Sequence, residues 1–151
     1  MNVTKKDFES ALTQIREIMS DYKISIDDIK RDLQEGISIP VSIFNSKCSP
    51  LGAICVYLKD KHEMGFSEIA RKLNRDPRTI WLTYQKNYKN KQKINFDFVI
   101  GLNVFSERRL SVMEHLVSNL RDRGLKLTKI ADLTGKSPKT IWSFYNRAKK
   151  K

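Results

Sequence analysis

The N-terminal part of the chain has a regular apolar pattern. Its apolar residues recur alternately every four and every three positions, which is the spacing of a heptad seam. The seam comprises Phe8, Leu12, Ile15, Met19, Tyr22, Ile26, Ile29 and Leu33. The other faces are charged, so the pattern predicts a helix over 7–35 that forms a coiled coil in a homodimer. Two alternatives stay open: the helix packs on its own domain, or it breaks at Ile24 and folds back as a hairpin whose second helix is capped by Ser25 and Asp28.

Two short stretches alternate apolar residues with small or polar ones, which is the period of a strand. They are residues 37–44, ISIPVSIF, and residues 99–105, VIGLNVF. In register, Ile39, Val41, Ile43 and Phe44 correspond to Ile100, Leu102, Val104 and Phe105. Pro40 restricts the first stretch to the edge of a sheet. We expect either that the two segments pair with each other or that they are apolar loops that fill helical cores.

A helical pattern is written twice. Residues 66–88, FSEIARKLNRDPRTIWLTYQKNY, align without a gap with residues 127–149, LTKIADLTGKSPKTIWSFYNRAK, 61 positions later. Before each copy lies a further apolar stripe at helical spacing. These stripes are Leu51, Ile54, Cys55 and Leu58 in the first copy, and Val112, Met113, Leu116, Val117 and Leu120 in the second. Each repeat is therefore expected to contain three helices.

Turn and capping residues predict where these helices begin and end. Asn74 and Gly135 suit the left-handed position that follows a helix. Three pairs, Ser49-Pro50, Asp76-Pro77 and Ser137-Pro138, each place a capping oxygen before a proline at the first helical position. At the start of the middle helix, Lys126 and Lys129 of the second copy replace Gly65 and Glu68 of the first. That helix start is less clearly marked in the second copy.

The combined pattern, S/T-x-I-A, a Gly/Asn turn and S/D-P-x-T-I-W, resembles the helix-turn-helix of sigma-factor region four, LuxR-type regulators and serine recombinases. The resemblance covers residues 49–90 and 108–150. It implies a recognition helix in each repeat that enters the major groove of double-stranded DNA. The expected fold is mainly α: a helical oligomerisation segment (1–36) and two tri-helical helix-turn-helix repeats (37–90 and 91–151), each preceded by a short extended segment.

The last helix of each repeat has a repeated polar face. Rotation by 100° per residue places Tyr84 and Tyr88 on the core side with Ile80, and basic side chains opposite. Trp81 and Trp142 fall at the boundary, where packing against the first helix or the neighbouring turn is favoured over contact with phosphate or bases. The predicted DNA-binding residues are Arg75, Arg78, Thr79, Leu82, Gln85, Lys86 and Lys89 in the first repeat, and Lys136, Lys139, Thr140, Ser143, Asn146, Arg147 and Lys150 in the second. Long basic side chains on such a face can reach base edges and phosphates.

Charge is unevenly distributed. The chain carries a net charge of +12, yet residues 1–36 contain six Lys or Arg against eight Asp or Glu, and the remainder contains 23 against nine. The duplicated part is therefore the basic part, which favours a polyanionic partner. The basic segment 89–93 between the repeats is expected to lie along phosphates, and Lys149–Lys151 is expected to be a frayed tail.

Other classes of function lack their signatures in the sequence. There is no apolar run of membrane-spanning length and no apolar signal core, so a cytoplasmic, nucleoid-associated protein is expected. Cys48 and Cys55 lack metal-ligand spacing and are expected to be plain thiols, Cys55 in the core. No catalytic constellation or nucleotide-binding loop is present, so neither an enzyme nor a cofactor is expected.

The sequence predicts a sequence-specific double-stranded DNA-binding protein, a transcription regulator with two recognition helices, whose partners are DNA, a second copy and the transcription machinery. The alternatives are an architectural or segregation protein that coats DNA with little sequence preference, and a protein-interaction module that uses its helix-turn-helix surfaces.

Overall fold

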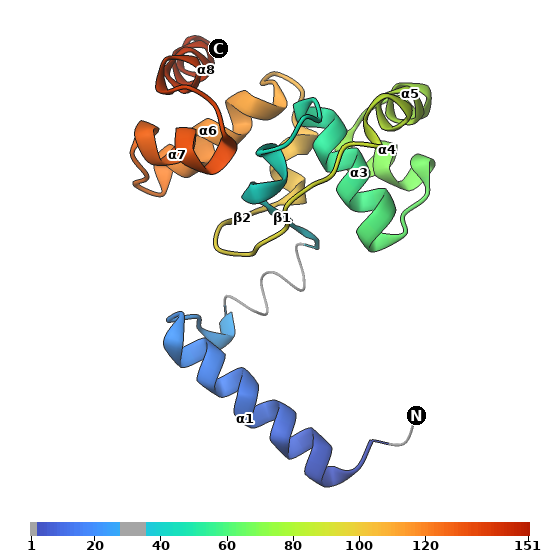
Figure 1. The fold of residues 1–151 in the computed structure, drawn as a ribbon, viewed down its shortest axis with the longest axis vertical. Coiled ribbons are helices and arrows are strands. Elements are labelled where there is room, and N and C mark those ends of the chain that lie inside the picture. The colour runs from blue at the N-terminus through green and yellow to red at the C-terminus, as the bar shows by residue number, and fades with distance from the viewer. Residues whose placement is uncertain (1–2, 28–35) are drawn as a thin grey trace. The chain divides into compact units, whose positions relative to one another are not determined.

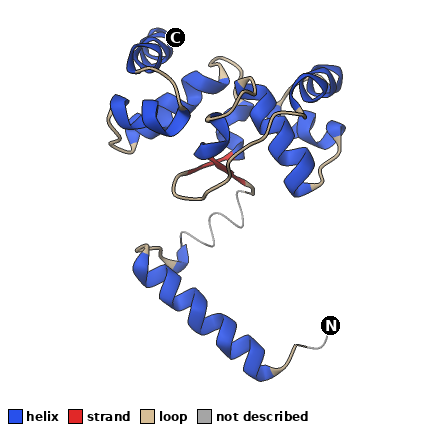
Figure 2. Ribbon diagram, viewed as in Figure 1, coloured by secondary structure: helices blue, strands red, loops and turns tan. Residues whose placement is uncertain are grey.

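The structure is a computed structural model that describes residues 3–27 and 36–151 (Figure 1). The chain divides into two compact units, residues 1–35 and 36–151. Within the described ranges the only sheet has two short strands, and helices dominate (Figure 2). The predicted mainly α fold class is confirmed. No helix among the described residues is both long and apolar enough to cross a membrane.

The first unit contains helix α1 (Lys5–Asp21), which begins with a capping box. Asp7 N donates to Thr4 Oγ1 at 3.2 Å, and Thr4 N donates to Asp7 Oδ2 at 3.0 Å. The helix ends before Tyr22, and Lys23 adopts a positive φ of 54°. The prediction of one uninterrupted helix to residue 35 is therefore wrong, and the break that the alternative placed at Ile24 is confirmed, because the left-handed residue lies beside it. The later seam residues Ile29 and Leu33 lie outside the described residues.

The second unit contains two sets of elements in the same order. The first set is β1 (Ser38–Pro40), the 3₁₀ segment η1 (Val41–Phe44), α3 (Pro50–His62), α4 (Phe66–Leu73) and α5 (Pro77–Asn87). The second is β2 (Val99–Gly101), η2 (Leu102–Ser106), α6 (Val112–Asp122), α7 (Leu127–Thr134) and α8 (Pro138–Lys150). Each set forms a three-helix module in which the last helix packs on the two before it.

Local capping chemistry accounts for most of these boundaries. Ser49, Asp76 and Ser137 are the N-caps of α3, α5 and α8, and each side chain accepts a backbone N–H. Asn74 (φ 54°) and Gly135 (φ 67°) end α4 and α7 in the left-handed region. Both sets of predictions are confirmed. Neither α4 nor α7 has a side-chain N-cap, and their buried apolar faces hold them instead.

The two strands pair antiparallel in a register that relates the repeats by a twofold axis. Ile39 lies opposite Ile100, its own equivalent in the repeat. Two further hydrogen bonds are also equivalent, from Val41 N to Phe98 O at 2.9 Å and from Leu102 N to Ile37 O at 2.8 Å. The predicted pairing of the extended segments is confirmed. A pseudo-twofold axis passes through the Ile39–Ile100 pair.

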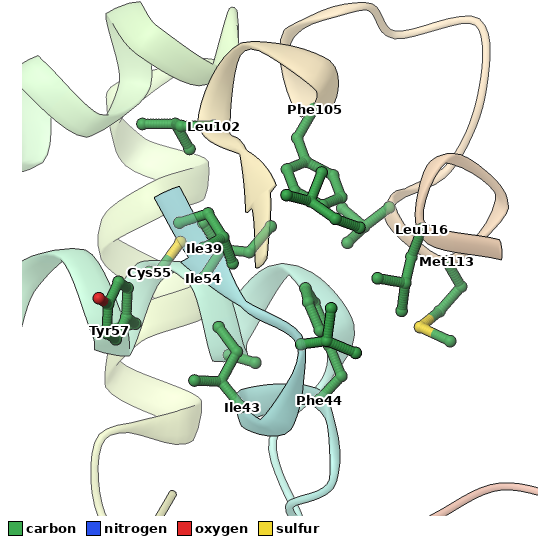
Figure 3. Packing of buried hydrophobic residues seen from close by; sticks show 14 of the residues in the cluster. Ile39, Ile43, Phe44, Ile54, Cys55, Tyr57, Leu102, Phe105, Met113 and Leu116 are labelled. Atoms are coloured by element: carbon green, nitrogen blue, oxygen red, sulfur yellow. The ribbon is translucent and has the colours of Figure 1, made fainter. Parts of the chain in front are cut away.

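Each extended segment crosses to the other module beyond the sheet. Only three residues of each are strand, and the rest turns into a 3₁₀ helix, so the expectation of a strand over 37–44 is wrong in its second half. Segment η1 packs against α7, and η2 packs against α4. The rings of Phe44 and Phe105 meet with centroids 6.1 Å apart. The alternative of segments that fill helical cores also holds: η1 packs against α3 of its own module as well as α7 of the other, and η2 packs against α6 as well as α4. The buried residues of both modules form one continuous cluster, part of which Figure 3 shows.

Candidate nucleic-acid interface

The last helices of the two modules, α5 and α8, occupy equivalent places around the pseudo-twofold axis. Ile80 and Ile141 are fully buried and anchor each helix to its own module. In Figure 1 both helices lie on the edge of the second unit away from β1 and β2. Their outer faces are therefore presented from one edge of the molecule.

Most of the predicted DNA-binding side chains lie at the surface. The exposed ones are Arg78, Thr79, Leu82, Gln85, Lys86, Lys89, Lys139, Thr140, Arg147 and Lys150, and the half-buried ones are Arg75, Lys136, Ser143 and Asn146. Two hydroxyls of α8 are engaged within the helix: Ser143 Oγ donates to Lys139 O at 3.0 Å, and Thr140 Oγ1 shares a hydrogen bond with Ser137 Oγ at 2.8 Å. Arg78 and Lys139, near the helix N-termini, make no ion pair among the described residues.

The two tryptophans each leave about half of the side chain exposed, Trp81 48% and Trp142 55%. Their predicted packing against the first helix or the neighbouring turn is therefore at most partial. Trp81, Leu82 and Phe66 line an open apolar hollow of about 440 Å³ next to Arg78. The N-terminal half of α5 thus presents apolar surface and a guanidinium side by side.

A buried asparagine occupies a core position that the sequence analysis gave to a tyrosine. Tyr88 is 44% exposed, whereas Asn87 is buried. Asn87 Oδ1 accepts from Ser49 N at 2.9 Å, and its Nδ2 donates to Thr83 O at 2.7 Å. The bond to Ser49, the N-cap of α3, ties the end of α5 to the start of α3, whereas the bond to Thr83 lies within α5. The sequence signal for this contact is Gly52, because a Cβ at that position would strike the Asn87 side chain.

In the second module, ion pairs join the start of α6 to the end of α8. Glu114 stands at the position of Gly52 and is buried. Its Oε2 accepts from Lys151 Nζ at 2.9 Å and from Ser111 N at 3.1 Å, and Arg147 Nε lies 3.9 Å from its Oε1. The prediction of a frayed basic tail is therefore wrong at Lys151. Arg147, although exposed, is drawn toward α6.

Burial raises the pKa of Glu114. The hydrogen bonds from Lys151 and Ser111, and then the charges of Lys151 and Arg147, lower it by more than burial raises it, so the net pKa lies below its ordinary 4.5. A depressed pKa means that the ionised form stabilises the fold. This stability is complete above the unfolded pKa and is lost as pH falls through the folded pKa.

Glu114→Gln should therefore cost stability at neutral pH and progressively less in acid. We expect its difference from the parent protein in free energy of unfolding to be constant between about pH 8 and 6 and to shrink below about pH 4.5. Urea denaturation across that range measures the difference, with the exposed Glu63→Gln as control. A difference that stays constant down to about pH 3 would contradict the assigned role of Glu114.

Arg75 and Lys136, which were predicted to bind DNA, lie in the turns before α5 and α8. Both are half-buried, because each turn packs beside the loop that follows the 3₁₀ segment of the other module. Arg75 lines a hollow together with Arg108, and Lys136 lines one together with Lys47. Their placement follows from the crossing of η1 and η2, which helical periodicity does not contain.

The segment between the modules packs against α3, and the two cysteines are buried. Gln92 Nε2 donates to Ala53 O at 2.8 Å, so the segment 89–93 is held against α3. Both cysteines are free and buried. Burial raises the pKa of the Cys55 thiol to about 12, so the thiol stays protonated at neutral pH.

The chain was compared with protein-family models, with curated proteins and with solved structures, and none of them matches it.

Proposed function

We propose that this protein binds double-stranded DNA in a sequence-specific manner, with α5 and α8 as recognition helices in two major grooves, and that it regulates transcription. The proposal is supported chiefly by one observation: two helices related by a pseudo-twofold axis expose equivalent basic positions, Arg78 with Lys139 and Lys89 with Lys150, while their equivalent core anchors are buried. A solvent-facing helix needs no such repetition. Side chains near a recognition-helix N-terminus contact base edges, and later cations contact phosphates.

The pseudo-twofold axis implies the form of the DNA site. Helices related in this way enter grooves about 34 Å apart, or about 10–10.5 base pairs, and read an inverted repeat. The repeat should be imperfect, because Lys139 and Ser143 replace Arg78 and Leu82. Arginine suits guanine and a leucine suits the methyl group of thymine, whereas serine donates or accepts. The two half-sites should therefore differ in sequence.

Selection of bound duplexes from a random pool tests the proposal. At about 0.15 M salt, an enriched sequence should bind about a thousandfold more tightly than random DNA. A protein that coats DNA would show no enrichment and a steep loss of affinity with salt. The apolar hollow formed by Phe66, Trp81 and Leu82 favours a second candidate function, docking of a protein partner. That function would leave the selection without any bound duplex.

Helix α1 supplies the proposed dimer contact. None of its residues is buried, and its seam residues Phe8 and Ile15 are 59% and 47% exposed. An apolar stripe of this kind on a helix with a charged opposite face is typical of a helix that pairs with another chain. We therefore include a homodimer through this segment in the proposal.

Deletion of residues 1–35 should convert a dimer into a monomer while the second unit stays folded and binds DNA more weakly. The reason is that the buried hydrophobic residues of the second unit form a core of their own. Sedimentation equilibrium at about tens of micromolar measures both chains. A full-length protein that is monomeric at that concentration would rule out the dimer.

A further inference from the structure

Two hollows occupy equivalent places around the pseudo-twofold axis. In the first, of about 530 Å³, the turn residue Arg75 of one module faces Arg108 in the loop after η2 of the other. In the second, of about 670 Å³, the turn residue Lys136 faces Lys47 in the loop after η1. Gly135 in that turn lies so close to Asn45 that a Cβ would strike the asparagine side chain. The crossing of the extended segments thus brings cations from both modules together twice.

Neither hollow has an acidic residue in its lining. The first is lined by four cations, of which Lys151 pairs with Glu114 and Arg109 lies 3.9 Å from Glu107. Arg75 and Arg108 make no ion pair within the described part of the chain. The second hollow has four lysines, at 47, 89, 91 and 136, likewise unpaired among the described residues. Two guanidiniums in the first hollow and four lysine side chains in the second are therefore left without an ion-pair partner among the described residues.

Arg75 is the cation of the first hollow whose charge is least satisfied by its surroundings. Its Nε is buried and has no hydrogen-bond partner among the described residues. Burial, and then the charge of Arg108, lowers the pKa of its guanidinium. The first turns of α3 and α6 also line this hollow, and helix N-termini favour anions. The N-terminus of α6 already has the Glu114 carboxylate in its capping box. The unpaired buried donor, the two guanidiniums without an ion-pair partner and the N-terminus of α3 together favour binding of an anion.

We propose that the hollow between Arg75 and Arg108 binds a phosphate group, and that the lysine-lined hollow is its weaker counterpart. Guanidinium groups hold phosphate oxygens in a planar, bidentate way, whereas lysines act as point charges. The phosphate belongs either to the DNA backbone between the two half-sites or to a small phosphorylated molecule. The first source rests on the proposed function, and the second goes beyond it.

Titration of the full-length protein with pyrophosphate, without DNA, tests the hollow itself. The parent protein should show a saturable site, and Arg75→Gln/Arg108→Gln should weaken it at least about tenfold. Arg16→Gln removes one charge from α1 in the other unit and should leave binding unchanged. Unchanged affinity in the double variant would overturn the proposal.

Thermal melting without pyrophosphate separates a binding role from a structural one. Because the two arginines repel each other, the double variant should melt no lower than the parent protein. If it does melt lower, the single variant Arg108→Gln decides, since Arg108 is exposed and its loss cannot disturb the core. Pyrophosphate affinity equal to that of the parent in Arg108→Gln would then overturn the proposal.

The salt dependence of DNA binding identifies the source of the phosphate. If it is a backbone phosphate, the slope of log affinity against log salt should fall by about 0.9 in the double variant and stay unchanged in Arg16→Gln. If the slope is unchanged and pyrophosphate alters DNA affinity in the parent protein alone, the ligand is a small phosphorylated molecule. If no duplex binds at all, the proposed function fails, while the pyrophosphate titration still decides the hollow.

Discussion

Phe105→Ala is expected to destabilise the second unit by about 3–5 kcal/mol. Phe105 is fully buried, and its ring contacts Phe44 of the other module near the pseudo-twofold axis. Its removal leaves a cavity between elements that both modules share, so neither module can close it alone. Urea unfolding measures the loss, with Phe96→Ala as control: Phe96 is largely exposed, and its substitution should change stability by no more than about 0.5 kcal/mol.

The shared core also predicts how the protein unfolds. Because η1 and η2 cross between the modules, the two modules should lose structure in one transition, with Trp81 and Trp142 reporting the same midpoint. Fluorescence of variants that keep only one of the two tryptophans measures the unfolding midpoint of each module separately. If the Trp81 and Trp142 reports gave two different unfolding midpoints, the core shared by the two modules would be contradicted.

Arg78→Ala and Lys139→Ala are each expected to weaken binding to a selected DNA site by about 1–3 kcal/mol and to relax the preference for neighbouring base pairs. The two positions lie in different modules, so the losses should roughly add in the double variant. Both side chains are exposed, and the fold should be unharmed. Binding isotherms on the selected site and on point-mutated sites measure both effects.

Controls with matched charge separate base reading from a general loss of positive charge. Arg16→Ala and Lys6→Ala change side chains of α1 in the other unit, and neither should alter the preference between sites. Lys86→Ala, further along α5, should weaken binding to all sequences about equally. If the Arg78 and Lys139 variants bind like the parent protein, the recognition faces are assigned wrongly.

Local chemistry made the helices of the second unit predictable. Each N-cap followed by proline, and each Asn or Gly at a helix end, acts through backbone geometry that needs no tertiary context. Because the repeat places such residues at equivalent positions in both copies, each boundary was indicated twice. At the end of α1 the apolar seam continues past Lys23 although the backbone turns there. Periodicity alone favours an uninterrupted helix, and only the capping residues Ser25 and Asp28 indicate the break at Ile24.

The pairing of the extended segments was predicted, but the packing of each 3₁₀ segment against the other module was not. A repeat states that Phe44 and Phe105 are equivalent, but it does not state that their rings meet. For the same reason, the sequence did not indicate that Arg75 and Lys136 lie beside loops of the opposite module. Buried polar contacts such as Asn87 with Ser49 also escape an analysis that takes buried positions to be apolar.

Hydroxyl-radical footprinting of the selected duplex tests the central proposal most directly. The account predicts two protected segments about 10–10.5 base pairs apart with inverted but unequal half-sites, and Lys139→Ala should weaken protection of only one of them. A single protected segment of about five base pairs, unchanged by alanine at Lys139 and Ser143, would contradict it, because α8 would then take no part in reading DNA.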